Sequence, residues 1–290
     1  MSTPAPLLVP GLAALAPRYR AILCDVWGVL HNGVAAFPAA CAALQRFRRE
    51  TGAPVVLITN APRPSPPILE QLARLGVPDD AFDAVVTSGD VTRAEILAHR
   101  EAPILHIGPE RDRTLFADLD VTLADETAAR QVVCTGLLDD ERETPEDYRP
   151  LLERLVARDL PFLCANPDIV VERGSTLIWC AGALARLYED LGGRVTIQGK
   201  PHPPIYKAAM ERLAELTGAP VAREAVLAIG DGLPTDIRGA VANELDVLFI
   251  TGGIHGADFG PADAPDETLI RRRLAEDGLA ATAALPKLVW

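Results

Sequence analysis

The feature that most constrains the fold of this chain is an alternation of short apolar runs with segments of helical periodicity. The runs are rich in β-branched residues and occupy 21–24, 54–59, 84–88, 103–108, 131–136, 161–166, 225–230 and 246–251. Continuous apolar runs of this length are typical of strands buried on both faces of a sheet. Between them, apolar residues recur at helical spacing, as at Ala40, Leu44 and Phe47. Strand and helix in alternation predict an α/β fold with a parallel sheet.

Composition limits the classes of protein to which this chain can belong. Its 290 residues are 49% hydrophobic and carry a formal net charge of -12, which is typical of a globular protein of one or two domains, and we expect two. The acidic balance argues against nucleic acid or an anionic membrane as partner, because both need a basic surface. The five cysteines include no Cys-x-x-Cys pair and lie mostly in apolar runs. This pattern predicts reduced core residues in a cytoplasmic protein.

Two proline-rich stretches are predicted to lack regular structure. The first twenty residues are apolar, but they hold four prolines and no basic cluster, so we expect an arm that docks on the protein rather than a signal peptide or membrane span. The stretch 61–67, "APRPSPP", is expected to be a loop.

Polar residues follow several of the predicted strands, where the ligand crevice of an open parallel sheet lies. Asp25 and Asp231 each end an apolar run, and two carboxylates there would share one Mg²⁺. Thr59 and Asn60 end another run, and Lys200 follows a glycine. A hydroxyl, an amide and an ammonium are suited to bind phosphoryl oxygens. Asp25 would then attack phosphorus and form an aspartyl-phosphate.

Four segments, taken in order, carry a family resemblance. They are "CDVWGVLHNG" (24–33), "LITNAP" (57–62), "QGKPHPPIY" (198–206) and "IGDGLPTDIRGA" (229–240). They resemble motifs I to IV of the haloacid-dehalogenase-like (HAD) hydrolase superfamily, best in its subclass IIA, the NagD-like and p-nitrophenylphosphatase-like proteins. The resemblance implies a Rossmann-like core with a parallel sheet over 1–101 and 193–290, and an inserted α/β cap domain of C2 type over 102–192.

The resemblance also implies an activity and a role for each matching residue. The expected activity is Mg²⁺-dependent hydrolysis of a small phosphorylated metabolite, such as a sugar phosphate, with Asp25 as nucleophile. The remaining roles are metal binding by Asp25, Asp231 and the backbone carbonyl of Trp27, support of the metal site by Asp236, phosphate binding by Thr59, Asn60 and Lys200, and substrate contact by Asn166 and Asp168 of the cap. A homodimer formed through the cap is a further expectation.

Motif I departs from the pattern of the active phosphatases at one residue. These enzymes carry Asp-x-Asp, and this chain has Trp27 at the second acid. That acid protonates the leaving alkoxide and later activates water, which is worth about 10²- to 10⁴-fold in rate. An indole has only an N–H donor and performs neither step. His31 is the candidate substitute base.

Three hypotheses follow from Trp27. The first is a phosphatase that is restricted to good leaving groups or that uses His31. The second is a catalytically inactive protein that binds a phosphorylated ligand. The third is dehalogenase-like attack of Asp25 on a carbon–halogen bond, because haloacid dehalogenases carry a tyrosine at this position. Lys200, Asp231 and Asp236 keep the metal-and-phosphate pattern, which favours the first two.

Overall fold

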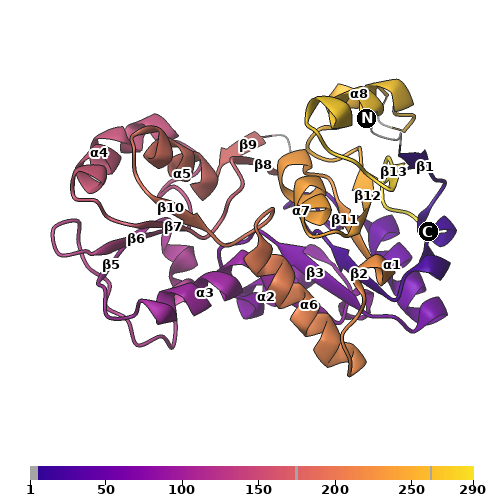
Figure 1. Ribbon diagram of the computed structural model, residues 1–290, viewed down its shortest axis with the longest axis horizontal. Coiled ribbons are helices and arrows are strands. Elements are labelled where there is room, and N and C mark those ends of the chain that lie inside the picture. Colours follow the sequence, from indigo (N-terminus) through magenta and orange to yellow (C-terminus); the bar gives the residue numbers. More distant parts are fainter. Residues whose placement is uncertain (1–5, 174–175, 262) are drawn as a thin grey trace. The chain divides into compact units, whose positions relative to one another are not determined.

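The chain is an α/β protein with two parallel sheets, as seen in a computed structural model that describes residues 6–173, 176–261 and 263–290 (Figure 1). The predicted fold class is confirmed. The chain divides into two compact units. One consists of Met1–Thr59, Leu69–Val86 and Tyr206–Trp290, and the other consists of Asn60–Ile68 and Thr87–Ile205.

The first unit is built on a seven-stranded sheet of order β1-β13-β12-β11-β2-β3-β4. Its strands are β1 (Leu7–Leu8), β2 (Ala21–Cys24), β3 (Val55–Thr59), β4 (Ala84–Thr87), β11 (Val226–Gly230), β12 (Asp246–Ile250) and β13 (Ala283–Leu285). The neighbours from β1 through β3 pair in parallel. Every residue of β2, β3 and β11 is buried, as expected for strands that are covered on both faces.

Within the described part of the chain, five α-helices accompany this sheet, although α2 and α6 each begin with residues of the other unit. They are α1 (Pro38–Thr51), α2 (Ser65–Leu75), α6 (Pro203–Thr217), α7 (Arg238–Ala242) and α8 (Glu267–Glu276), and a π-helical turn, η7 (Leu233–Ile237), precedes α7. Short 3₁₀ turns are η1 (Leu12–Ala14), η2 (Ala16–Arg18), η3 (Asp79–Ala81), η6 (Arg223–Ala225) and η8 (Gly256–Phe259). Helix α1 buries Ala40, Leu44 and Phe47, as its spacing predicts.

The start of α2 corrects the prediction of a loop over 61–67. Ser65, Pro66 and Pro67 form the first turn of this helix. Proline is compatible with a first turn, because the backbone N–H that it lacks would have no partner inside the helix there. The loop prediction was therefore wrong for the last three of its seven residues.

The second unit contains a four-stranded parallel sheet and a separate two-stranded antiparallel one. The first has the order β10-β7-β6-β5, with β5 (Ile104–Ile107), β6 (Gln131–Cys134), β7 (Phe162–Cys164) and β10 (Val195–Ile197), and the second joins β8 (Val170–Arg173) to β9 (Thr176–Trp179). The helices are α3 (Ser88–Ala98), α4 (Arg149–Ala157) and α5 (Ala181–Asp190), with 3₁₀ segments η4 (Glu110–Phe116) and η5 (Pro145–Tyr148).

Alternate residues of β6 face two different apolar clusters. Val132 and Cys134 pack with residues of α4 and α5, and Val133 packs with Ile96 of α3 and with Leu115 of η4. Both faces of this sheet are therefore covered (Figure 1). Because of these contacts α3 lies in the second unit, as does 193–205, whereas the predicted core of 1–101 and 193–290 included both. The division into core and cap stays a prediction.

The strands that the sequence pattern did not predict are short, and several are partly exposed. They are β1, β8, β9, β10 and β13. Strand β1 belongs to the predicted N-terminal arm and pairs with β13, whereas residues 1–5 of that arm lie outside the described residues. All five cysteines are buried and stand outside any disulfide, as the sequence predicts.

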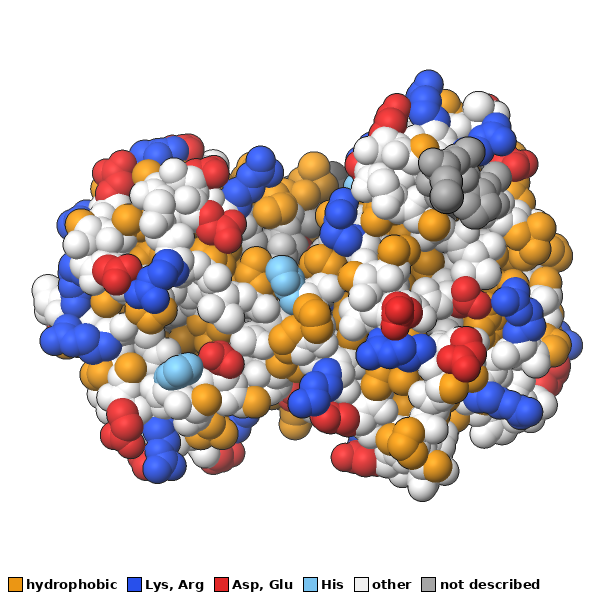
Figure 2. All heavy atoms as spheres, in the orientation of Figure 1, with side chains coloured by type: hydrophobic (Ala, Val, Ile, Leu, Met, Phe, Trp, Pro, Cys, Tyr) orange, Lys and Arg blue, Asp and Glu red, His pale blue; other side chains and the backbone are white. Residues whose placement is uncertain are grey.

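The surface in Figure 2 shows Lys and Arg interspersed with Asp and Glu, without an extended basic patch on this face. Among the described residues, no helix combines the length and apolar character that crossing a membrane requires.

Candidate active site

Two of the predicted site residues follow the central strands of the first unit. Asp25 comes directly after β2, and Asp231 directly after β11. These strands are neighbours, with β3 and β4 on one side and β12 and β13 on the other. A strand order that reverses in this way creates the crevice in which α/β proteins bind ligands. The Asp25 N–H donates to the Ile229 carbonyl at 2.8 Å, which fixes its place beside β11.

Asp25, Asp231 and Asp236 form a buried carboxylate cluster. Their side-chain oxygens lie within 4.8 Å of one another, and the residues are only 5%, 5% and 6% exposed. Carboxylates this close repel one another, and burial increases the cost of their charge. A divalent cation removes this cost, and carboxylate oxygens are the ligands that Mg²⁺ prefers. The donor set therefore fits Mg²⁺.

Backbone groups hold two of these carboxylates in place. The Oδ2 atom of Asp236 accepts a hydrogen bond from the Gly232 N–H at 3.0 Å, because the π-helical turn η7 folds the chain back on itself. The Oδ2 atom of Asp231 accepts one from the Ile254 N–H at 2.8 Å. Ile254 lies beyond β12, and no pattern in the sequence indicates its role, because only the parallel pairing of β11 and β12 brings it there.

Glycines allow the backbone to approach this cluster. Gly28 has a φ of +83°, and a Cβ there would lie 2.3 Å from Asp231 Oδ2. A Cβ at Gly253 would lie 1.9 Å from the same oxygen, and one at Gly230 would lie 2.3 Å from the Asp236 Cβ. No larger residue fits at these positions without displacing a carboxylate. Gly28 and Gly230 belong to the quoted motifs, whereas Gly253 was not singled out.

Trp27 packs within the loop between β2 and α1. Its ring lies edge-on to His31, with 5.0 Å between the ring centroids. A Cβ at Gly33, whose φ is +81°, would lie 2.6 Å from Trp27 Cζ2. The loop therefore accommodates the indole by having a glycine opposite it.

His31 is poorly suited to accept a proton in this environment. It is 2% exposed, and its Nδ1 accepts a hydrogen bond from the Gly33 N–H at 3.0 Å. Burial lowers the His31 pKa to about 4, so the ring is neutral at pH 7 and a weak base. Its role as substitute base stays a prediction, and this environment weighs against it.

The phosphate-binding residues predicted from the sequence lie in both units. Thr59 ends β3 in the first unit and is buried. In the second unit, the Asn60 Nδ2 donates to Asp168 Oδ1 at 2.8 Å and to the Lys200 carbonyl at 3.2 Å. The Lys200 N–H donates to Asn60 Oδ1 at 2.7 Å. The Asn60 amide thus joins three predicted residues, and since both its hydrogens are used, phosphate binding by that amide stays a prediction.

The remaining predicted residues adjoin this contact. Lys200 is buried, and the Asp168 N–H donates to Asn166 Oδ1 at 3.1 Å. A Cβ at Gly199 would lie 2.6 Å from Asn60 Oδ1 and 2.7 Å from Pro167 Cδ. Gly199 therefore permits the close approach of Asn60 and Pro167.

A parallel sheet with an acidic cluster at its point of strand reversal defines an α/β protein of Rossmann-like fold. The model of the haloacid dehalogenase-like hydrolase family matches residues 22–122, and a HAD-hydrolase-like model matches residues 197–276. The crystal structure of a haloacid dehalogenase-like hydrolase from Brucella suis has 52% sequence identity and a TM-score of 0.87, over 97% of this chain and 100% of that one. The chain belongs to the haloacid dehalogenase-like hydrolase family.

Two further proteins are similar to this chain, one in sequence and one in fold. The ribonucleotide monophosphatase NagD of Escherichia coli is 26% identical over 242 residues, which cover 82% of this chain and 89% of NagD. The crystal structure of a 4-nitrophenylphosphatase from Thermotoga maritima has a TM-score of 0.63 at 22% identity, over 87% of this chain and 94% of that one, and it bears on the fold alone. The predicted resemblance to subclass IIA is confirmed.

Proposed function

We propose that this protein is a Mg²⁺-dependent phosphatase that hydrolyses a small phosphorylated metabolite through an aspartyl-phosphate at Asp25. The observation that carries the proposal is the buried cluster of Asp25, Asp231 and Asp236 at the ends of adjacent strands. It is supported by the relatives, since NagD is named a ribonucleotide monophosphatase. A phosphomonoester, such as a sugar phosphate, is the expected class of substrate.

The carboxylates of Asp25, Asp231 and Asp236, with the backbone carbonyl of Trp27, would hold the Mg²⁺. When bound, the ion supplies positive charge that neutralises the phosphoryl oxygens and offsets the repulsion within the cluster. The Trp27 carbonyl is an acceptor whatever side chain the residue carries.

Asp25 then acts as the nucleophile. One carboxylate oxygen forms a bond to phosphorus, the bond from phosphorus to the leaving oxygen breaks, and that oxygen takes the electron pair. A water molecule attacks the phosphorus of the aspartyl-phosphate, and the acyl phosphate bond breaks. The water's protons pass to the released phosphate or to solvent, and the Asp25 carboxylate is restored. Thr59, Asn60 and Lys200 are proposed to bind the phosphoryl oxygens, and Asn166 and Asp168 to contact the substrate.

Trp27 restricts which substrates react quickly. The leaving oxygen needs a proton unless its alcohol is already acidic, and neither the indole nor a neutral His31 is a good source. Aryl phosphates and acyl phosphates react without this help, because their leaving groups, an aryloxide and a carboxylate, are weak bases. We therefore expect turnover to fall steeply as the pKa of the leaving alcohol rises.

Two other functions are weighed against this one. Trp27 itself favours a protein that binds a phosphorylated ligand without turnover. The experiment below distinguishes such a binding protein from a phosphatase. Dehalogenase-like chemistry needs no metal ion, so it does not account for a buried cluster of three carboxylates. A homodimer through the cap and a cytoplasmic location also stay predictions.

The test is phosphate release from p-nitrophenyl phosphate and acetyl phosphate with Mg²⁺ and with EDTA. Asp25→Asn removes the nucleophile and should lower the Mg²⁺-dependent rate at least 10³-fold. Asp263→Asn is the control, because Asp263 is exposed and pairs with Lys287. Release that survives in Asp25→Asn would exclude the proposed mechanism. No release from wild type, with Mg²⁺-linked binding of phosphate, would establish the binding protein instead.

A further inference from the structure

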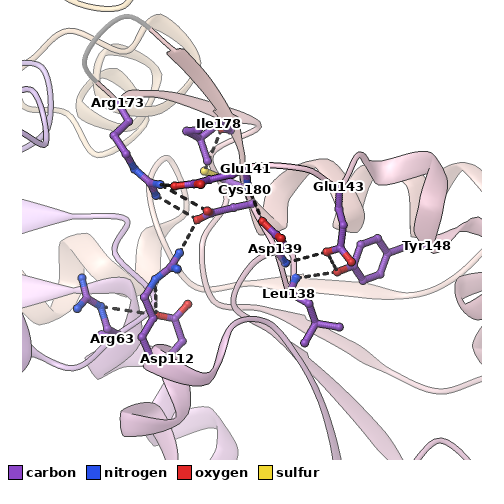
Figure 3. Close-up of polar contacts among 12 residues, drawn as sticks. Arg63, Asp112, Leu138, Asp139, Glu141, Glu143, Tyr148, Arg173, Ile178 and Cys180 are labelled. Atoms are coloured by element: carbon purple, nitrogen blue, oxygen red, sulfur yellow. Dashed lines mark hydrogen bonds and ion pairs between the residues drawn. The ribbon is translucent and has the colours of Figure 1, made fainter.

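We propose that the second unit contains a binding site for a carboxylate or phosphate group of a small molecule. The site is the arginine cluster, which we define as Arg63, Arg111 and Arg173 together with Asp112 and Asp140. Figure 3 shows Arg63 directed toward Asp112 and Arg173 directed toward Glu141. The inference rests on the proposed function only in the case that this carboxylate or phosphate group is part of the substrate of the phosphatase.

The cluster lies at the carboxyl ends of two neighbouring strands of the parallel sheet. Strand β5 leads through Gly108 into η4, which carries Arg111 and Asp112. Strand β6, its parallel neighbour, leads into the loop that carries Asp140. This edge of a parallel sheet is where α/β proteins bind ligands, and it belongs entirely to the second unit.

Two guanidinium groups converge on one carboxylate. Arg111 contacts Asp140 through Nη2, and Arg173 Nη2 lies 3.0 Å from Asp140 Oδ2. Asp140 is mostly buried, with a side chain only 11% exposed, whereas the side chains of Arg111 and Arg173 are 51% and 35% exposed. Glu141 lies 3.8 Å from Arg173, but it is exposed, so solvent screens that pair. Over the cluster as defined, three guanidinium groups face two carboxylates, Asp112 and Asp140, which leaves one positive charge that a further anion can neutralise.

A second carboxylate of the cluster, Asp112, contacts Arg111 and Arg63. Asp112 is buried, and its Oδ1 lies 3.6 Å from Arg63 Nε and 4.0 Å from Arg111 Nε. Asp112 therefore holds Arg63 and Arg111 near each other.

The loop that carries Asp140 is held on its other side. The Tyr148 hydroxyl donates to a Glu143 oxygen at 2.7 Å and accepts from the Leu138 N–H at 2.7 Å. The Asp139 N–H donates to the same Glu143 oxygen at 2.8 Å. These contacts are visible in Figure 3. An arginine pair that is anchored in this way presents planar N–H donors in a fixed arrangement, which suits bidentate binding of an oxyanion.

The test compares two substrates that differ in one group. 3-Phosphoglycerate carries a carboxylate where glycerol 3-phosphate carries a hydroxymethyl group. We expect wild type to have a KM for 3-phosphoglycerate about tenfold below that for glycerol 3-phosphate, which corresponds to one charge-assisted contact. Arg111→Gln and Arg173→Gln should each remove most of this difference and change kcat little. Arg194→Gln is the control, because Arg194 precedes β10 at the opposite edge of the same sheet and pairs with exposed Asp159.

A second measurement separates the sources of the anion and does not need turnover. Calorimetric titration with malonate in EDTA tests the cluster directly, and we expect binding to wild type and to Arg194→Gln but not to Arg173→Gln. If malonate binds but the KM values for 3-phosphoglycerate and glycerol 3-phosphate are equal, the site binds a separate small anion. If the KM values differ as expected, the site binds the carboxylate of the substrate. Absence of both overturns the proposal. Failure of the proposed function is recognised separately, as absence of phosphate release from p-nitrophenyl phosphate. Circular dichroism melting verifies that each variant folds.

Discussion

At the scale of the residue, Trp27 lies where the family resemblance predicts a second acid. The indole packs against Gly33 and His31, so it also shapes the loop after β2. Replacing Trp27 therefore has opposite effects on catalysis and on the stability of the loop. A substitution that restores acid–base function removes part of the support of the loop.

We predict that Trp27→Asp raises kcat for glycerol 3-phosphate by about 10²-fold, because it restores the acid that protonates an alkoxide. Loss of the half-buried ring should cost about 2 kcal/mol of unfolding free energy. Phosphate release and urea unfolding measure the two effects. Trp27→Phe, which keeps a ring without an acid, should leave kcat unchanged. Equal kcat values for wild type and a folded Trp27→Asp would show that the site lacks something other than this acid.

A second prediction concerns His31 and the pH dependence of stability. Burial lowers its pKa to about 4 in the folded protein, against 6.5 in the unfolded chain. Between these values the unfolded state binds more protons, so stability is full above pH 6.5 and falls as the pH decreases toward 4. The loss should be about 2–3 kcal/mol by pH 4.5.

Urea unfolding at pH 7 and pH 4.5 tests this prediction. The measured quantity is the loss of unfolding free energy between the two pH values, compared between wild type and two variants. His31→Gln should lose about 2–3 kcal/mol less than wild type over this interval. His99→Gln should lose as much as wild type, because His99 is exposed. The same loss in all three proteins would mean that His31 is protonated in the folded state.

At the scale of the element, the loop between β2 and α1 approaches the carboxylate cluster at Gly28. Gly28 and Gly52, the residue that follows α1, both have a positive φ, of +83° and +68°, but only at Gly28 would a Cβ contact another group, Asp231 Oδ2 at 2.3 Å. At Gly52 no atom lies within 4 Å. The pair therefore separates backbone strain, which both substitutions share, from displacement of a carboxylate.

We predict that Gly28→Ala weakens Mg²⁺ binding about tenfold, because Asp231 must move away from the new methyl group. Gly52→Ala should leave Mg²⁺ affinity unchanged, and both should lose about 1 kcal/mol or more of unfolding free energy. Calorimetric titration with Mg²⁺ measures the affinities. Equal affinity in the two variants would exclude Asp231 as a metal ligand.

At the scale of the whole molecule, the two units have separate sheets, and the carboxylate cluster belongs to the first alone. A ligand that binds only the folded state stabilises it by about 2.7 kcal/mol at a hundredfold excess over its Kd. Because the cluster closes around the ends of β2 and β11, bound Mg²⁺ should act on the first unit.

We predict that Mg²⁺ slows hydrogen exchange at the ends of β2 and β11 and leaves β5, β6 and β7 unchanged. Mass spectrometry of peptides from each unit, with Mg²⁺ and with EDTA, measures the effect. Asp236→Asn should reduce the protection, since it removes one carboxylate from the cluster. Protection of β5 to β7 equal to that of β2 would show that the ion acts elsewhere or on both units together.

The sequence by itself predicted the buried strands, the parallel sheet and the family, because continuous apolar runs and local motifs are properties of short segments. It also singled out Asp25 and Asp231, since parallel strands place their carboxyl ends at one edge, and Asp236 through the resemblance to motif IV, and the structure brings these three carboxylates together. It did not predict β8 and β9, whose partly exposed residues lack the pattern of a buried strand.

Only the tertiary structure decided which distant groups meet. The Ile254 N–H reaches Asp231, the Asn60 amide joins Asp168 to Lys200, and arginines from separate segments gather on Asp112 and Asp140. The physical reason is that a hydrogen bond or ion pair between residues far apart in sequence leaves no periodic signal. It depends on strand pairing and burial, which bring the partners together only when the sheet forms.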